Sequence, residues 1–183
     1  MSHIPVLLKE TIKILDPKPG EFFIDGTLGE GGHAKEVLRQ IGSEGIFLGV
    51  DWDPKAVSIC KLKIGDYRNV IFVQDNFANL PEILAKNNLP QANGLILDLG
   101  FSSEQIENSK RGFSFRSSAE GDEPLLMTYS DGQKPAYEWL KRLKESELAG
   151  IIEKFGEERY AFKIARAIKK NLPIKTTGKL ADL

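Results

Sequence analysis

The chain has few of the residues that build disulfides or metal centres. Among its 183 residues there is one cysteine, Cys60, and there are two histidines, His3 and His33. A single cysteine excludes an internal disulfide framework and a Cys-rich zinc module. Two histidines leave little material for a His-based metal site, so the sequence predicts no metal centre.

Long apolar segments are also absent. No apolar run approaches the ~20 residues that a helix needs to span a bilayer. The N-terminus, MSHIPVLLKE, contains an acidic residue and no apolar stretch of the signal-peptide type. These absences predict a cytoplasmic protein with no membrane partner. Apolar residues still make up 41% of the chain, enough for the core of one compact domain, with or without a small appendage.

The net charge of −1 is unevenly distributed along the chain. Residues 1–133 include 13 basic and 19 acidic residues, whereas residues 134–183 include 12 basic and seven acidic residues. The last quarter of the chain is therefore basic. A near-neutral total does not exclude a polyanionic partner.

Four short apolar runs predict the strands of a parallel sheet. They are continuous rather than alternating, as in strands that are buried on both faces. The runs are Phe22–Asp25, Ile46–Asp51, Val70–Gln74 and Gly94–Leu99. Helix-like stretches lie between them, at Ala34–Ile41, Pro54–Lys63 and Leu80–Asn87. This alternation predicts an α/β fold with helices on both faces of the sheet.

The pattern changes after the fourth run. A loop rich in Ser, Gly, Asp and Pro follows, then apolar residues at helical spacing from Pro135 to Asn171, and a short helix with Thr177 as a possible N-cap. We therefore expect a core over residues 1–106, a loop over 107–134 and a helical part over 135–183. Four strands are half of a doubly wound sheet, so the fourth would be an exposed edge and a possible route to a homodimer.

The most informative segment is a glycine-rich loop between the first strand and the following helix. Its glycines are Gly26, Gly29, Gly31 and Gly32, and the helix begins near His33. Such a loop lets a ligand approach the backbone and the helix N-terminus. Asp51 closes the second strand, where nucleotide-binding α/β folds place an acidic residue against ribose hydroxyls. The alternative is a turn that only packs the helix on the strand.

The loop does not have the spacing of a dinucleotide-binding motif. Its glycines are shifted from the G-x-G-x-x-G pattern, and Glu30 inside it would repel a pyrophosphate. A ligand with a ribose and no phosphate, such as S-adenosylmethionine, suits these charges better. A nicotinamide-dependent dehydrogenase is correspondingly disfavoured.

Two residues at the ends of the third and fourth strands add to this candidate site. Phe77 could flank an adenine, although a core position is as consistent with the sequence. Asp98 ends an apolar run, where a carboxylate is costly unless it faces a site or is well paired. Ligands of open parallel sheets bind beyond the carboxyl ends of the strands, which is where both residues are expected.

Seven collinear motifs resemble one family, the bacterial S-adenosylmethionine-dependent 16S ribosomal RNA cytosine-N4 methyltransferases (MraW family). They are HIPVLLKE at 3–10, DGTLGEGGH at 25–33, GVDWDPKA at 49–56, ILDLGFSSEQI at 96–106, RGFSF at 111–115, FGEERYAFKIARAI at 155–168 and PIKTT at 173–177. The resemblance implies a class I methyltransferase core with a helical domain inserted after the fourth strand. It also implies a 16S ribosomal RNA partner in the small subunit and a decoding-centre cytidine as the target.

The same resemblance implies a set of cofactor contacts. By motif position these are Gly31, Gly32, His33, Asp51, Phe77, Asp98 and Gln105. The chain departs from the family after RGFSF, where Leu126 and Thr128 replace an acid and an arginine, which puts a substrate role of that loop in doubt. It also ends where members of the family continue, so a truncated, non-catalytic remnant that binds cofactor or RNA or self-associates is the alternative function.

The expected chemistry gives two further predictions. The N4 amine of cytosine is a poor nucleophile because its lone pair is delocalised into the ring, and an acceptor for its N–H bonds would activate it. We expect Asp98 to be that acceptor, unless its carboxylate serves the cofactor instead. Four basic residues at helical spacing, Arg159, Lys163, Arg166 and Lys170, predict an RNA-facing stripe, with a plain solvated face as the alternative.

Overall fold

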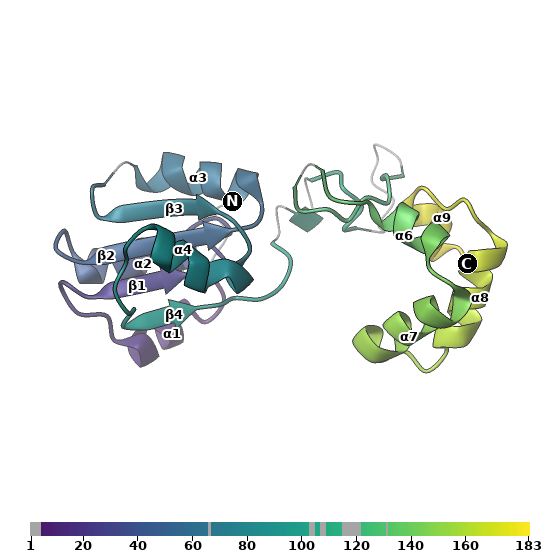
Figure 1. Cartoon of the computed structure of the whole chain (residues 1–183), viewed down its shortest axis with the longest axis horizontal. Helices are drawn as coiled ribbons and strands as arrows, with labels where there is room; N and C mark the ends of the chain where they lie inside the picture. The colour runs from purple at the N-terminus through teal and green to yellow at the C-terminus, as the bar shows by residue number, and fades with distance from the viewer. Residues whose placement is uncertain (1–4, 66, 103–104, 107–108, 115–121, 131) are drawn as a thin grey trace. The chain divides into compact units, whose positions relative to one another are not determined.

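The computed structural model describes residues 5–65, 67–102, 105–106, 109–114, 122–130 and 132–183 (Figure 1). The chain divides into two compact units, an N-terminal unit over Met1–Gly100 and a C-terminal unit over Phe101–Leu183. Each unit is described by itself below.

The N-terminal unit is built on a four-stranded parallel sheet with the strand order β3-β2-β1-β4. Its strands are β1 (Phe22–Asp25), β2 (Ile46–Asp51), β3 (Val70–Gln74) and β4 (Gly94–Ile96). The first three strands have the predicted bounds. The fourth was predicted too long, because β1 ends at Asp25, which pairs with Ile96, and leaves residues 97–99 without a partner strand.

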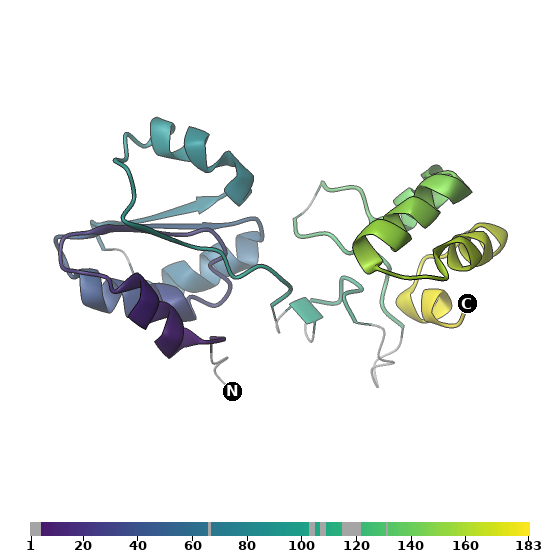
Figure 2. The same cartoon turned by 90° about the horizontal axis from the view of Figure 1, so that it is seen from below.

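Helices cover both faces of this sheet, which confirms the predicted α/β architecture. They are α1 (Leu8–Leu15), α2 (Gly32–Ile41), α3 (Pro54–Ile64) and α4 (Leu80–Lys86), with a short 3₁₀ turn, η1 (Phe77–Asn79), before α4. The first three lie on one face and α4 lies on the other (Figure 2). The sequence predicted α2, α3 and α4 to within two residues at each end and did not predict α1.

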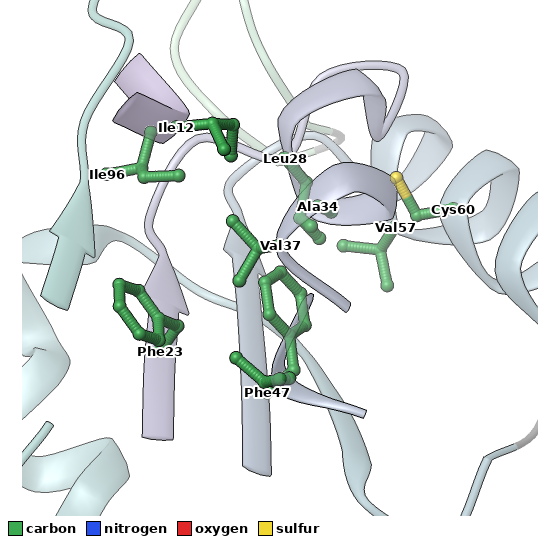
Figure 3. Packing of buried hydrophobic residues seen from close by; sticks show 10 residues of the cluster. Ile12, Phe23, Leu28, Ala34, Val37, Phe47, Val57, Cys60 and Ile96 are labelled. Atoms are coloured by element: carbon green, nitrogen blue, oxygen red, sulfur yellow. The ribbon is translucent and has the colours of Figure 1, made fainter. Parts of the chain in front are cut away.

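Two apolar clusters explain why β1 and β2 are continuous apolar runs. Phe23 and Phe47 pack beneath α2 and α3 with Val37, Val57 and other residues (Figure 3). Their strand neighbours, such as Ile24 and Leu48, point to the opposite face and pack with residues of α4. Because side chains alternate between the two faces of a strand, both sets are buried only in a sheet that is covered on both sides.

The C-terminal unit is helical after a long loop. Its helices are α6 (Ala136–Arg142), α7 (Glu145–Gly156), α8 (Ala161–Lys170) and α9 (Thr177–Ala181). Leu148, Ala165, Ile168 and Ile174 belong to its core, and Leu125 of the loop packs with them. The loop is tied to the segment before α9, since the Leu125 N–H donates to the Lys175 carbonyl at 2.8 Å.

Two details of these helices bear on the sequence predictions. The N-cap of α9 is Thr176, with Thr177 as its first residue, so the predicted cap was one residue late. Within the described part of the chain, no helix is long and apolar enough to cross a membrane.

Candidate cofactor site

Three carboxylates lie at one edge of the parallel sheet. Asp25 is the last residue of β1, Asp51 is the last residue of β2, and Asp98 follows β4 by two residues. Asp25 is in register with Gly49 of β2 and with Ile96 of β4. The carboxyl ends of the strands therefore meet at the edge where open α/β sheets bind ligands.

The glycine-rich loop is fixed to this edge by its backbone. The Gly26 N–H donates to the Ile96 carbonyl at 2.9 Å, and the Gly29 N–H donates to Oδ2 of Asp51 at 3.0 Å. Gly31 has a φ of +79° and is the N-cap of α2. A Cβ on Gly31 would lie 2.9 Å from Sγ of Cys60, so both its conformation and the contact with α3 require glycine.

The carboxylate of Asp51 links the loop after β1 with the loop after β2. Oδ2 accepts from Gly29, and Oδ1 accepts from the N–H of Asp53 at 2.8 Å. Burial raises the pKa of Asp51, and these two backbone hydrogen bonds oppose the rise. Each oxygen has further acceptor capacity, which is what a pair of ribose hydroxyls would need.

Asp25 is a candidate site residue that the sequence did not single out. Its side chain is 1% exposed. Burial raises its pKa to about 7, the hydrogen bond from the Thr27 N–H opposes the rise, and the charges of Asp51 and Asp98 add to it. A signal is present in the sequence, since Asp25 and Asp51 end the first two predicted runs and Asp98 lies one residue before the end of the fourth.

Thr27 connects Asp25 with the segment after β4. Its N–H donates to Oδ1 of Asp25 at 3.0 Å, and its Oγ1 accepts the N–H of Asp98 at 2.7 Å. The Asp98 residue is exposed. Asp98 is therefore not at the end of a buried strand as predicted, because β4 ends at Ile96, and its place in the site stays a prediction.

The sequence did not decide whether Phe77 is a core residue, and in the structure it is not. It begins η1 directly after the loop that follows β3, and it is 39% exposed. A Cβ on Gly26 would lie 3.2 Å from Cβ of Phe77 and 2.6 Å from Cδ2 of Leu97. Phe77 and Leu97 thus flank the start of the glycine-rich loop, and the ring of Phe77 is accessible there.

Gly32 and His33 contact the N-terminal segment of the chain. A Cβ on Gly32 would lie 2.0 Å from Cγ of Pro5. Nε2 of His33 lies 3.2 Å from the Val6 carbonyl oxygen, and the His33 side chain is buried. In this structure both residues hold the segment before α1 against the N-terminus of α2.

Gln105 belongs to the C-terminal unit. Its Oε1 accepts from the Ser102 N–H at 3.0 Å, and its own N–H donates to Oγ of Ser102 at 3.1 Å. The structure therefore brings together six of the seven predicted cofactor contacts, all in the N-terminal unit. Gln105 is the exception, and its cofactor role stays a prediction.

The charges at this edge suit a cationic ligand with hydroxyl donors. Three carboxylates stand at the sheet edge, whereas Glu30, which the sequence analysis set against a pyrophosphate, is paired with Lys63 at 2.9 Å. Carboxylate oxygens are acceptors, so this edge can take hydroxyl groups and positive charge, both of which S-adenosylmethionine carries. Among the described residues, no three His, Cys, Asp or Glu side chains are grouped so that they could hold a metal ion.

The four basic residues of the predicted stripe make different contacts. Nε of Arg166 is paired with Oε1 of Glu145 at 3.1 Å. The guanidinium of Arg159 and Nζ of Lys163 instead lie over the ring of Tyr160, at 4.7 and 5.3 Å from its centroid. Lys170 is exposed at the end of the helix. The four residues are therefore not equivalent.

Comparison with known proteins gives whole-chain matches. The model of the MraW methylase family matches residues 1–183. The chain is 40% identical over 186 residues to ribosomal RNA small subunit methyltransferase H of Clostridium botulinum strain 657, and 43% identical over 183 residues to the protein of that name from Buchnera aphidicola. All of this chain is covered in both, but only 59% and 58% of the relatives.

Solved structures overlap with smaller parts of the chain. A SAM-dependent O-methyltransferase from Thermotoga maritima covers 43% of this chain, with 32% of that chain, at 20% identity and a TM-score of 0.38. Fibrillarin from Aeropyrum pernix, solved with natively bound S-adenosyl-L-methionine, covers 43% of this chain and 33% of its own, at 23% identity and a TM-score of 0.37. These partial overlaps do not bear on the activity.

Proposed function

The chain belongs to the MraW methylase family, and we propose that it transfers a methyl group from S-adenosylmethionine to the exocyclic N4 of a cytidine in 16S ribosomal RNA. Membership confirms the family recognised from the motifs and, with it, the methyltransferase fold class and S-adenosylmethionine as cofactor. The chain spans about 59% of the length of the curated relative from Clostridium botulinum. The reaction, the target atom and the RNA partner are therefore proposals for this chain.

The observation that carries the proposal is the acidic edge of the sheet beside the glycine-rich loop. Asp51 has acceptor capacity for the ribose hydroxyls, and the exposed ring of Phe77 can flank the adenine. Asp25 lies buried at the same edge, and its ionised form attracts the positive charge of the cofactor. Bound S-adenosylmethionine supplies an electrophilic methyl group, and the protein has to align the nucleophile with it and exclude water.

Gly31, Gly32 and His33 would act on the cofactor through the backbone. Gly31 starts α2, whose first N–H groups have no partner within the helix. Gly32 and His33 keep the segment at Pro5 and Val6 against this helix end. Gly32 and His33 are positioning residues in this proposal, because the His33 side chain contacts that segment and Gly32 leaves room for it.

Asp98 is proposed to activate the nucleophile. It lies in the exposed segment after β4, and its backbone is held by Thr27. A carboxylate that accepts an N–H bond from the cytosine amine localises the lone pair on N4 and helps to remove the proton. Asp98→Asn should therefore bind cofactor normally and lose turnover by roughly 10²-fold or more. Full turnover of this variant would refute the catalytic role.

Calorimetric titration tests the cofactor site directly. We expect S-adenosylmethionine to bind and NAD not to bind. Asp51→Asn should weaken binding, because a neutral amide is a poorer acceptor for ribose hydroxyls. Glu44→Gln, which removes an exposed charge outside the site, serves as the control. Binding of NAD in preference to S-adenosylmethionine would overturn the assignment.

A methylation assay tests the reaction and its alternative. Small ribosomal subunits and free 16S ribosomal RNA are incubated with the chain and labelled S-adenosylmethionine, and the nucleosides are separated. N4-methylcytidine is the expected product. If S-adenosylmethionine binds but no nucleoside is labelled, the non-catalytic alternative, a chain that binds cofactor or RNA, replaces the enzyme. A ribosomal substrate also implies a cytoplasmic location, which fractionation would test.

A further inference from the structure

Cationic side chains lie over aromatic rings at several places in the C-terminal unit. Nζ of Lys134 is 5.2 Å from the ring centroid of Trp139, and Nζ of Lys154 is 5.2 Å from that of Phe155. Arg159 and Lys163 share the ring of Tyr160. Alternation of basic and aromatic side chains is typical of surfaces that bind unpaired nucleotides.

Two of these rings flank the connection between α7 and α8. Phe155 is 74% exposed near the end of α7, and Tyr160 is 48% exposed at the N-cap of α8. The buried face of α8 is formed by Ala161, Ala165 and Ile168, so neither ring is needed for the core. We call Lys154, Phe155, Arg159, Tyr160 and Lys163 the α7–α8 turn surface.

Two other basic residues of α8 already have partners within the protein. Arg166 is paired with Glu145, and Nζ of Lys169 donates to the carbonyl oxygens of Leu140, Lys141 and Leu143. Arg159 and Lys163 instead lie over Tyr160. Of the predicted stripe, these two residues are therefore the ones that surround an accessible ring.

Acidic residues at the same turn limit what kind of nucleic acid fits. Glu158 accepts the N–H of Tyr160 at 2.7 Å and is tied to the backbone. Glu153 and Glu157 are exposed, so the turn is not a continuous basic track for the backbone of a duplex. The exposed ring of Tyr160 has two cations over it, and when these cations turn to adjacent phosphates the ring is left for one unpaired base.

We propose that the α7–α8 turn surface binds single-stranded RNA by stacking an unpaired base on Tyr160, with Arg159 and Lys163 contacting the neighbouring phosphates. This inference rests on the proposed function for the identity of the nucleic acid. It places the recognition of the RNA strand in the C-terminal unit, apart from the acidic cofactor edge of the N-terminal unit. Stacking is tolerant of base identity, whereas the two cations make binding depend on salt.

The test measures the affinity of the full chain for a fluorescent, unstructured cytidine-containing RNA and for the same strand in a duplex. Tyr160→Ala should weaken single-strand binding roughly 10-fold, and Tyr160→Phe should retain it because the ring remains. Arg159→Ala with Lys163→Ala should lower the slope of log affinity against log salt by about one to two. Lys141→Ala, which removes an exposed cation of α6 outside the predicted stripe, is the control and should leave both affinity and slope nearly unchanged.

Each outcome bears on one of the two proposals. Equal affinity of Tyr160→Ala and the parent chain, stronger binding of the duplex, or no RNA binding at all would overturn the turn surface. Circular dichroism of each variant checks that it is folded, and Phe155→Ala repeats the test at the second ring. If the turn binds RNA as expected but no cytidine is methylated, only the proposed reaction fails. Methylation without any effect of Tyr160→Ala on RNA affinity refutes only the turn surface.

Discussion

At the residue scale, the unusual group is a carboxyl that stays protonated well above the pH range in which aspartates ordinarily ionise. In an unfolded chain Asp25 ionises near pH 3.8, whereas in the folded N-terminal unit its pKa is about 7 because the side chain is buried. Between these values the folded state binds one more proton than the unfolded state. Its stability therefore falls as pH rises through this window and levels off above pH 7.

Asp25→Asn should remove this pH dependence. A full pKa unit corresponds to about 1.4 kcal/mol, so the parent chain should lose roughly 2–3 kcal/mol of unfolding free energy between pH 5 and pH 7 through this group. The measurement is urea unfolding followed by the fluorescence of Trp52, with Trp139 replaced by Phe. Glu44→Gln is the matched surface control. A variant as sensitive to pH as its parent would show that Asp25 is already ionised at pH 5.

Cofactor binding should respond to the same proton. A cationic ligand beside Asp25 favours the carboxylate, so the affinity for S-adenosylmethionine is expected to rise as pH increases from 6 to 8, with proton release. Calorimetry in two buffers of different ionisation enthalpy measures that release. The Asp25→Asn variant should show a smaller release, and an unchanged release in this variant would assign the proton to another group.

Motif spacing in the sequence predicted which of these residues lie at the sheet edge. Asp51 was found because it lies at a fixed offset from Gly31, and β1 and β2 were found because both of their faces are apolar. The role of Asp25 depends on its burial and on the nearby charges of Asp51 and Asp98, which come from separate strands. No pattern within one segment of the sequence predicts how close these three carboxylates lie in the fold. The contacts of Gly32 and His33 with Pro5 and Val6 were missed for the same reason.

At the element scale, the structure distinguishes two adjacent lysines of α8. Lys169 and Lys170 are neighbours on α8, yet only Lys169 reaches the end of α6, where it binds three carbonyl oxygens. These carbonyls include the last ones of α6, which have no partner within the helix. A cation there both satisfies them and interacts favourably with the helix dipole.

Lys169→Met should destabilise the C-terminal unit by about 2 kcal/mol, because the hydrogen bonds are lost while the apolar stem is kept. Trp139 lies on α6 and reports this unfolding when Trp52 is replaced by Phe. Lys170→Met, at an exposed position, should change the unfolding free energy by less than about 0.5 kcal/mol. Equal effects of the two substitutions would mean that the contacts of Lys169 contribute little.

At the scale of the whole molecule, the acidic and basic parts of the sequence largely coincide with the two compact units. The acidic cofactor edge belongs to the N-terminal unit, and the basic last quarter of the sequence belongs to the C-terminal unit. Among the described residues, β3 and β4 are the two edge strands of the sheet. The edge at β4 is apolar, since Leu95 of the strand and Leu97 and Leu99 after it are 45%, 40% and 66% exposed.

An exposed, apolar edge strand is a template for pairing with another chain. We therefore expect this chain to self-associate through β4, with an apparent mass in sedimentation that rises with concentration. Leu95→Lys should suppress the association, since a charged side chain on the edge strand opposes pairing and the Leu95 side chain is already half exposed. Leu62→Lys, at an exposed leucine of α3 far along the chain from the edge, controls for the added charge.

If both substitutions reduce the mass equally, the association is general hydrophobic contact. If the parent chain is monomeric at every concentration, the edge of β4 does not pair between copies.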